Sequence, residues 1–168
     1  MKRLREVDYF EPQTVEEAVA MLAGVGDGAY PLAGGTDLVV DMKMERLQPA
    51  AIVNLKRIPG LGGIEAAETG TRIGALTRVT EIAASDEVGR RHPALADAAG
   101  VLAPEQVRHL ATIGGNVGRA SPASDLGPPL IVHQAVATIA GPDGTREQPV
   151  EGLYTGPGVT ALGPADII

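Results

Sequence analysis

The sequence contains no cysteine and no tryptophan, and its aromatic residues are limited to three tyrosines and one phenylalanine. Without cysteine the chain has no disulfide framework, and it offers no thiolate to hold an iron–sulfur cluster or to act as a nucleophile. Its three histidines, His92, His109 and His133, are too far apart in the sequence to form a short metal-ligand motif. These absences exclude the usual short cysteine and histidine motifs.

Positive charge and long apolar runs are also scarce. The chain has 14 lysines and arginines against 21 aspartates and glutamates, which gives a formal net charge of -7. Because the basic residues are scattered, they form no stripe that could bind nucleic acid or an anionic membrane. No apolar run approaches the roughly 20 residues that span a bilayer, and no apolar signal core follows the basic start. We therefore expect a cytoplasmic protein with no membrane span and no nucleic-acid partner.

The remaining composition is that of a folded domain rich in glycine and proline. Hydrophobic residues make up 44% of the 168 residues and charged residues 21%, which is ordinary for a globular protein. This length suits one domain or two small lobes. The 22 glycines and 13 prolines cluster in particular stretches without forming a repeat, so they indicate specific loops rather than low complexity.

Residues 1–56 are predicted to form an N-terminal α/β lobe. Thr14 and Glu17 have the spacing of a capping box, which predicts the start of a helix. The elements expected after this helix are a strand, a helix and a strand, at residues 30–33, 37–43 and 51–55. Alternating strands and helices of this kind favour a small parallel sheet.

Residues 57–168 are predicted to form a second lobe of mixed character. Turn residues at 68–70 and 141–144 each separate two short strand-like stretches, which is the pattern of a β-hairpin. Helices are expected at residues 77–84, 94–102 and 105–110. The fold class is therefore α+β, with a small parallel-sheet lobe followed by a mixed or antiparallel lobe.

Two glycine pairs, Gly34-Gly35 and Gly114-Gly115, are the most informative feature of the sequence. Successive backbone N–H groups around such a turn, followed by the positive end of a helix, make a cradle for phosphate oxygens. Glycine suits this role because a Cβ atom would hold the ligand away and would disfavour positive φ angles. One such loop alone is more typical of an ordinary turn and helix cap. Two loops from two lobes could hold both ends of one extended dinucleotide between them.

Four stretches, in their order along the chain, carry a resemblance to a known family. They are Ala33-Gly34-Gly35-Thr36-Asp37-Leu38, Ile73-Gly74-Ala75-Leu76-Thr77, Ala111-Thr112-Ile113-Gly114-Gly115-Asn116-Val117 and Ala120-Ser121-Pro122-Ala123-Ser124-Asp125-Leu126. From about Phe10 to its last residue, the chain resembles the FAD-binding subunit or domain of molybdenum hydroxylases. This family includes the carbon monoxide dehydrogenase medium subunit and the xanthine dehydrogenase flavin domain.

The resemblance implies a two-lobed FAD-binding fold of the vanillyl-alcohol-oxidase (PCMH) type, without a Rossmann sheet. It also implies that FAD is bound non-covalently, because related oxidases attach flavin through histidine or cysteine, whereas Thr36 stands here and cysteine is absent. Family members continue beyond the region that matches residues 162–168 into a C-terminal domain that helps to cover the flavin. We expect that domain to be missing from this chain.

By resemblance, the cofactor contacts fall in both glycine loops and at a few positions beyond them. The first loop would wrap the FAD pyrophosphate, and the second would contact the pyrophosphate, the ribose and the flavin edge. Asp125 would help to hold the adenosine side, while Leu102 and Leu162 would make apolar contacts. The residues expected to bind FAD are Pro31, Leu32, Ala33, Gly34, Gly35, Thr36, Asp37, Leu38, Leu102, Thr112, Gly114, Gly115, Asn116, Asp125 and Leu162. No catalytic residue and no metal ligand is expected.

The function implied is that of an FAD-containing electron-transfer subunit of a molybdenum hydroxylase or dehydrogenase, an oxidoreductase. A large molybdopterin subunit would oxidise the substrate, and [2Fe-2S] clusters in a small partner subunit would pass the electrons to this FAD. An acceptor such as NAD or a quinone would then receive them. The chemistry belongs to the cofactor, and the protein positions and tunes it. Two alternatives stay open: a standalone FAD-dependent oxidoreductase of the same fold, and a non-catalytic flavin-domain scaffold.

Some residues have competing interpretations. Residues 24–29 match the pattern G-x-G-x-x-A of a Rossmann site, but they follow a helix rather than a strand, so a helix C-cap and turn is the better interpretation. Arg119 would either pair with a cofactor phosphate or be a solvated surface residue. Asp125 would otherwise cap a following helix. A structural role is favoured for His109, and a partly buried position for His133.

Overall fold

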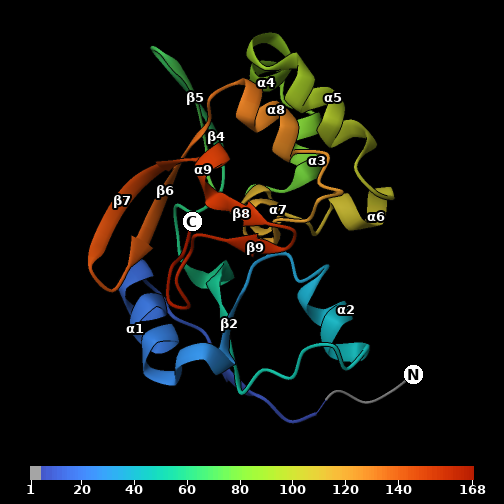
Figure 1. Cartoon of the computed structure of the whole chain (residues 1–168). Coiled ribbons are helices and arrows are strands. Elements are labelled where there is room, and N and C mark those ends of the chain that lie inside the picture. The colour runs from blue at the N-terminus through green and yellow to red at the C-terminus, as the bar shows by residue number, and fades with distance from the viewer. Residues whose placement is uncertain (1–4) are drawn as a thin grey trace.

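The computed structural model describes residues 5–168 and places a small parallel sheet with its helices beside a larger group of helices and short antiparallel strands (Figure 1). In chain order the elements are β1 (Asp8–Phe10), α1 (Val15–Val25), η1 (Gly26–Gly28), β2 (Ala29–Leu32), α2 (Leu38–Lys43), β3 (Ala51–Asn54), η2 (Leu55–Arg57), β4 (Ile64–Ala67), β5 (Gly70–Ile73), α3 (Val79–Ala83), α4 (Asp86–Arg91), α5 (Pro93–Val101), α6 (Glu105–Arg108), α7 (Ile113–Arg119), α8 (Gly127–Val132), β6 (Val136–Gly141), β7 (Gly144–Pro149), α9 (Val150–Leu153), β8 (Tyr154–Gly156) and β9 (Val159–Thr160). Within the described residues, no helix combines the length and the apolar character that crossing a bilayer requires.

The N-terminal sheet has the strand order β1-β3-β2, and both outer strands run parallel to β3. Ile52 of β3 is level with Tyr9 of β1 and with Tyr30 of β2. All of β3 is buried, because it has a strand on each side and α1 packs against this core through Ala18 and Leu22. The parallel sheet expected from the alternating strands and helices is confirmed.

Helix α1 begins and ends as its sequence predicts. The Thr14 hydroxyl accepts a hydrogen bond from the Glu17 amide at 3.1 Å, which satisfies one of the free amides of the first turn. The Glu17 carboxylate accepts from the amide of Gln13 at 2.8 Å, one residue earlier than in a standard capping box. Gly26 ends the helix with φ of 77°, and its amide donates to Leu22. The pattern at residues 24–29 is therefore a helix C-cap and turn.

The rest of the chain combines short antiparallel pairs with helices around a second core. The two predicted hairpins are confirmed as β4–β5 and β6–β7, whose turns close between Ala67 and Gly70 and between Gly141 and Gly144. Helix α4 was absent from the sequence-based expectations. It begins where the Ser85 hydroxyl accepts from a backbone amide, and it exists because Val88, fully buried, anchors it in this core.

Buried apolar residues form two clusters, and the end of the chain belongs to the N-terminal one. Ala165 and Ile167 pack in the same cluster as Leu22 and Val53. Ile167 also exchanges two backbone hydrogen bonds, each 2.8 Å long, with Ala140 at the end of β6. The division into lobes at residues 56 and 57 stays a prediction, but the final residues of the second predicted lobe clearly pack in the core of the first.

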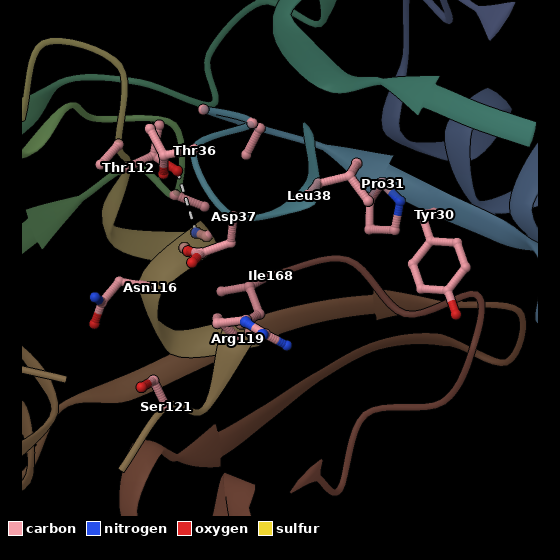
Figure 2. Close-up of a pocket in the computed structure, with 18 of the residues that line it drawn as sticks. Tyr30, Pro31, Thr36, Asp37, Leu38, Thr112, Asn116, Arg119, Ser121 and Ile168 are labelled. Carbon is pink, nitrogen blue, oxygen red and sulfur yellow. Dashed lines mark hydrogen bonds between the residues drawn. The ribbon is translucent and has the colours of Figure 1, made fainter. Parts of the chain in front are cut away.

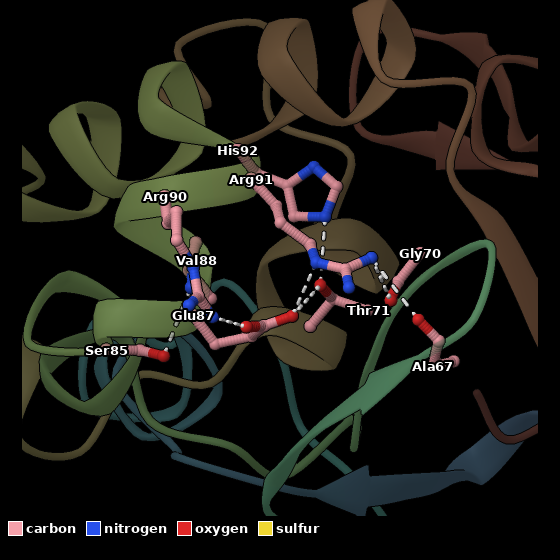
Figure 3. A network of polar contacts seen from close by, with 9 residues as sticks. All are labelled: Ala67, Gly70, Thr71, Ser85, Glu87, Val88, Arg90, Arg91 and His92. Carbon is pink, nitrogen blue, oxygen red and sulfur yellow. Dashed lines mark hydrogen bonds and ion pairs between the residues drawn. The ribbon is translucent and has the colours of Figure 1, made fainter.

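A polar network joins α4 to the β4–β5 hairpin (Figure 3). The Arg91 guanidinium donates to the carbonyl oxygens of Ala67 at 3.2 Å and Gly70 at 3.3 Å. It also pairs with the carboxylate of Glu87 at 2.9 Å, and the Thr71 hydroxyl donates to the same carboxylate at 3.4 Å. The network thus fixes the hairpin turn to helix α4.

His92 also contacts this network, and the shift in its pKa makes the stability of the fold depend on pH. One ring nitrogen of His92 lies 3.1 Å from the Thr71 hydroxyl, whereas its Nδ1 is buried without a partner among the described residues. The His133 ring meets it edge-on at 4.7 Å between centroids. The expectation that His133 is partly buried is wrong, because its side chain is exposed at the end of α8. Burial lowers the pKa of His92, and His133 and Arg91 lower it further, against the opposing effect of Glu87.

The described fold should therefore lose stability in mild acid. Since the pKa of His92 is lowered on folding, the unfolded chain takes up this proton first, and the unfolding free energy falls as the pH drops below 6.5, the ordinary pKa of histidine. We expect His133→Asn to reduce the loss between about pH 7.5 and about pH 5, measured by urea unfolding at each pH. His109→Asn, at an exposed position paired with Glu105, is the control. An acid loss equal in wild type and His133→Asn would contradict this account.

Candidate functional site

A cleft of about 750 Å³ lies between residues of the N-terminal sheet region, helix α7 and the last residues of the chain. Its volume is within the range of small-molecule sites. Thr36 and Asp37, from the segment after β2, line this cleft together with Asn116 and Arg119 of α7 (Figure 2). Ile168 enters the same opening.

The first glycine loop, residues 33–38, connects β2 to α2 along one side of this cleft. Gly35 has φ of 78°, a conformation that favours glycine. Gly34 is constrained differently, because a Cβ there would overlap the carbonyl oxygen of Leu110 and lie 3.0 Å from the Cα of Ala111. Gly34 therefore allows the loop to contact the segment that precedes α7, a reason for glycine that the sequence alone did not reveal; close approach of a ligand to Gly34 stays a prediction.

Backbone amides of this loop are available for a ligand. Among the described residues, the N–H groups of residues 34–37 have no hydrogen-bond acceptor in the protein, although these residues line the cleft. Val39 is the first residue here whose amide bonds back, to Gly35 at 3.1 Å. Buried or half-buried amides normally find a partner. A run of free N–H groups fits the oxygens of a phosphate or pyrophosphate.

The second glycine pair differs from its prediction. Gly114 and Gly115 lie in the first turn of α7 rather than in a loop, because Thr112 caps the helix and Ile113 and Val117 are buried one turn apart. The first four amides are already bonded within the protein: Ile113 to Thr77 O at 3.1 Å, Gly114 to Ala75 O at 2.8 Å, Gly115 to Thr112 Oγ1 at 3.1 Å and Asn116 to Thr112 O at 3.0 Å. The expectation of a second amide-lined cradle is wrong.

These glycines instead let α7 approach its neighbours. A Cβ at Gly114 would lie 2.7 Å from the Cβ of Ala75, so the helix packs closely against the segment after β5. A Cβ at Gly115 would lie 3.0 Å from the Thr112 hydroxyl and 3.7 Å from the Cβ of Ala33. Gly115 therefore faces the first glycine loop across a narrow part of the cleft, where any side chain would take space from a ligand.

Polar side chains at the other end of α7 complete this wall. The Ser124 hydroxyl donates to the Asn116 side-chain oxygen at 2.5 Å and accepts from the Gly127 amide at 3.0 Å. Ser124 rather than Asp125 therefore supports the start of α8. Asp125 is exposed at the cleft, where its carboxylate is available as an acceptor.

The last residues, 162–168, form a third side of the cleft, of which the sequence analysis had singled out only Leu162. The Asp166 carboxylate receives two hydrogen bonds from Arg146 of β7, at 3.1 and 2.6 Å, and one from the amide of Gly163 at 2.7 Å. The hydrogen bond from Arg146 keeps the pKa of Asp166 below its usual value, against a smaller opposing effect of burial. This clamp places Leu162 and Ile168 in the cleft.

Comparison with known proteins decides the family. The family described as "FAD binding domain in molybdopterin dehydrogenase" matches residues 5–168. The chain belongs to this family. It is 37% identical to the carbon monoxide dehydrogenase medium chain of Hydrogenophaga pseudoflava over 155 residues, 92% of this chain and 54% of that protein. It is 35% identical to the xanthine dehydrogenase FAD-binding subunit of Escherichia coli O157:H7 over 156 residues, 92% of this chain and 53% of that protein.

Solved structures agree with this assignment. Carbon monoxide dehydrogenase from Hydrogenophaga pseudoflava, in a form lacking the Mo-pyranopterin moiety, matches with a TM-score of 0.96 and 35% identity, over 99% of this chain and 58% of that one. Quinoline 2-oxidoreductase from Pseudomonas putida 86, at 21% identity and a TM-score of 0.93, shares the fold. The α+β flavin-domain fold implied by the resemblance is confirmed. The chain spans about half the length of the curated relatives it matches.

The residues that the family resemblance predicts as FAD contacts gather in one cleft. With the exception of Leu32, every residue that the sequence predicts as an FAD contact lines the cleft. Their roles as contacts stay predictions. The cleft also contains residues that sequence reasoning did not single out, among them Asp41 of α2 and Ile168. His109 is exposed, pairs with Glu105 at 3.6 Å and does not line the cleft.

Loss of the ion pair between Arg146 and Asp166 should loosen the side of the cleft that residues 162–168 form. We expect Arg146→Gln to speed hydrogen exchange at the amides of Ile167 and Ala140, because their mutual bonds depend on the chain end staying in place. Mass spectrometry or NMR would measure the exchange. Arg57→Gln, which removes an exposed ion pair with Glu11, is the control and should leave both amides unchanged. Equal exchange in Arg146→Gln and wild type would show that the clamp does not hold the segment.

Proposed function

We propose that this chain binds FAD in the cleft and serves as the flavin-binding part of an electron-transfer subunit in a molybdenum-containing hydroxylase or dehydrogenase. The observation that carries the proposal is the row of free amides at residues 34–37, which line a cleft in a chain of the FAD-binding family. Such donors suit the pyrophosphate of a dinucleotide because they offer positive partial charge without a side chain.

Different residues of the cleft would contact different parts of FAD. The amides of residues 34–37 would donate to the pyrophosphate, and the bare surface of Gly115 would let the cofactor pass close to α7. Asp125 would accept hydrogen bonds from the adenosine ribose, while the apolar side chains of Leu102 and Leu162 would exclude water. FAD bound there supplies the redox chemistry, so these residues need only bind, orient and shield it.

The partners follow from the same proposal. The relatives are named as a medium chain of carbon monoxide dehydrogenase and as an FAD-binding subunit of xanthine dehydrogenase, which are parts of larger enzymes. We infer that a large molybdopterin subunit and a small subunit with [2Fe-2S] clusters supply electrons to this chain. NAD or a quinone would accept them, and the complex would work in the cytoplasm.

Flavin binding can be tested directly with the purified chain. We expect the protein, after incubation with FAD and gel filtration, to carry visible flavin bands and to quench flavin fluorescence in a saturable titration. Denaturation in acid should release all of the flavin, as non-covalent binding requires. Absence of saturable binding in a folded sample, as judged by circular dichroism, would contradict the proposal.

A further inference from the structure

Negative charge dominates the cleft in which FAD is proposed to bind. Among the described lining residues, the carboxylates are Asp27, Asp37, Asp41, Asp125 and Asp166, whereas the only lysine or arginine is Arg119. The pyrophosphate of FAD would add two more negative charges, and like charges in a partly enclosed site repel each other strongly. Backbone amides provide only partial charges. A full positive charge at the cleft is therefore valuable for binding.

Arg119 is placed to deliver that charge. It is the last residue of α7, and its guanidinium lies 3.1 Å from the carboxylate of Asp41. Asp41 belongs to α2, the helix that directly follows the row of free amides at residues 34–37. Arg119, Asp37 and Ile168 all line the cleft, and Figure 2 draws their side chains together in it. The ion pair therefore joins the two sides of the cleft near the donors proposed for the pyrophosphate.

The ion pair can be exchanged at low cost. The side chain of Arg119 is 47% exposed, so it can change rotamer without unpacking the core. Asp41 has a second partner, because Arg46 lies 3.6 Å from its other carboxylate oxygen. If Arg119 turned toward a ligand, Asp41 would keep Arg46 as a positive neighbour. This matters because the Asp41 side chain is only 16% exposed, and an unpaired carboxylate there would be costly.

We propose that Arg119 is a cofactor-binding residue that exchanges its ion pair with Asp41 for the FAD pyrophosphate. The inference rests on the proposed function and adds a residue outside both glycine motifs. Asp41 acts against binding in this scheme, because it competes with the phosphate oxygens for the same guanidinium. Arginine suits the exchange because its planar fork binds carboxylate and phosphate oxygens with the same geometry.

The scheme predicts effects of opposite sign for the two partners. We expect Arg119→Gln to weaken FAD binding at least about tenfold, since a hydrogen bond to a charged group is lost. Asp41→Asn should strengthen FAD binding severalfold, because it removes both the competitor and one negative charge. A bridge that only holds the cleft together would make both variants bind more weakly. Arg119→Lys should give an intermediate affinity.

Fluorescence titration with FAD at several salt concentrations would test these expectations. The affinity of Arg119→Gln should depend less on salt than that of wild type, because one phosphate contact by a cation is missing. Arg90→Gln is the matched control: it lowers the net charge equally, and it removes an exposed arginine on α4, outside the cleft, whose partner Glu87 keeps its ion pair with Arg91. It should bind FAD as wild type does, and circular dichroism would confirm that each variant is folded.

The outcomes separate this inference from the proposed function. If wild type binds no FAD, the proposed function fails. If wild type binds FAD and Arg119→Gln binds it equally well, the function stands and the role of Arg119 is refuted. Weaker binding in Asp41→Asn would also refute the exchange, because it would identify the pair as a structural bridge.

Discussion

Replacing Gly34 with alanine is expected to separate the first glycine loop from the segment before α7 and to reduce FAD affinity at least about a hundredfold. The new Cβ would overlap the Leu110 carbonyl oxygen and lie 2.9 Å from its carbon and 3.0 Å from the Cα of Ala111. All of these are backbone atoms, so no side-chain rotation relieves the overlap. Overpacking of this kind also costs about 1–3 kcal/mol of folding free energy. FAD titration and thermal unfolding would measure the two effects.

Gly24→Ala is the matched control for this variant. Gly24 lies in α1, and its added Cβ would have no atom within 4 Å. Alanine there should stabilise the helix by roughly 0.5–1 kcal/mol, because glycine costs more backbone entropy. FAD affinity should not change. Near-wild-type binding and stability in Gly34→Ala would mean that the loop and the 110–111 segment are not in the close contact that the structure shows.

Gly115→Val is expected to weaken FAD binding at least about tenfold, equivalent to about 1.4 kcal/mol, while the chain stays folded. A Cβ here lies 3.0 Å from the Thr112 hydroxyl and 3.7 Å from the Ala33 Cβ. The nearest protein atom therefore belongs to a side chain that can shift slightly, at the cost of part of the helix cap, whereas the valine methyl groups would occupy cleft volume. The expected signature is a loss of affinity that exceeds the loss of stability.

Gly100→Val on α5 provides the comparison. Gly100 is exposed and its Cβ would meet no atom within 4 Å, so this variant makes the same helical glycine-to-valine change outside the cleft. Its FAD affinity should equal that of wild type. If Gly115→Val also bound FAD with wild-type affinity while folded, the cofactor would not pass between α7 and the first glycine loop.

Local signals in the sequence predicted much of this structure. The cap at Thr14, the hairpin turns and the alternation around β3 all act over a few residues, so their outcome can be read from the chain. The clustering of the expected FAD contacts was predicted through the family resemblance. Helix α4 was missed although Ser85 and the acids after it form a cap signal.

The contacts that the sequence did not reveal are long-range. Gly34 is needed because of Leu110, which is 76 positions later and cannot be identified as a neighbour from local pattern. The amides of α7 are occupied by carbonyl groups of Ala75 and Thr77, so the glycine pattern alone could not show whether they were free. The clamp between Arg146 and Asp166 likewise depends on how the chain end returns across β6 and β7.

That return has a consequence for the order of events during synthesis. Ala165 and Ile167 fill the core around α1 and β3, so the N-terminal sheet stays incompletely buried until these two residues have been translated. Pairing of such distant segments slows folding, because a long loop must close before the contacts are gained. Until Ala165 and Ile167 are made, the nascent N-terminal sheet exposes apolar surface. Exposed apolar surface of this kind is what chaperones bind during synthesis.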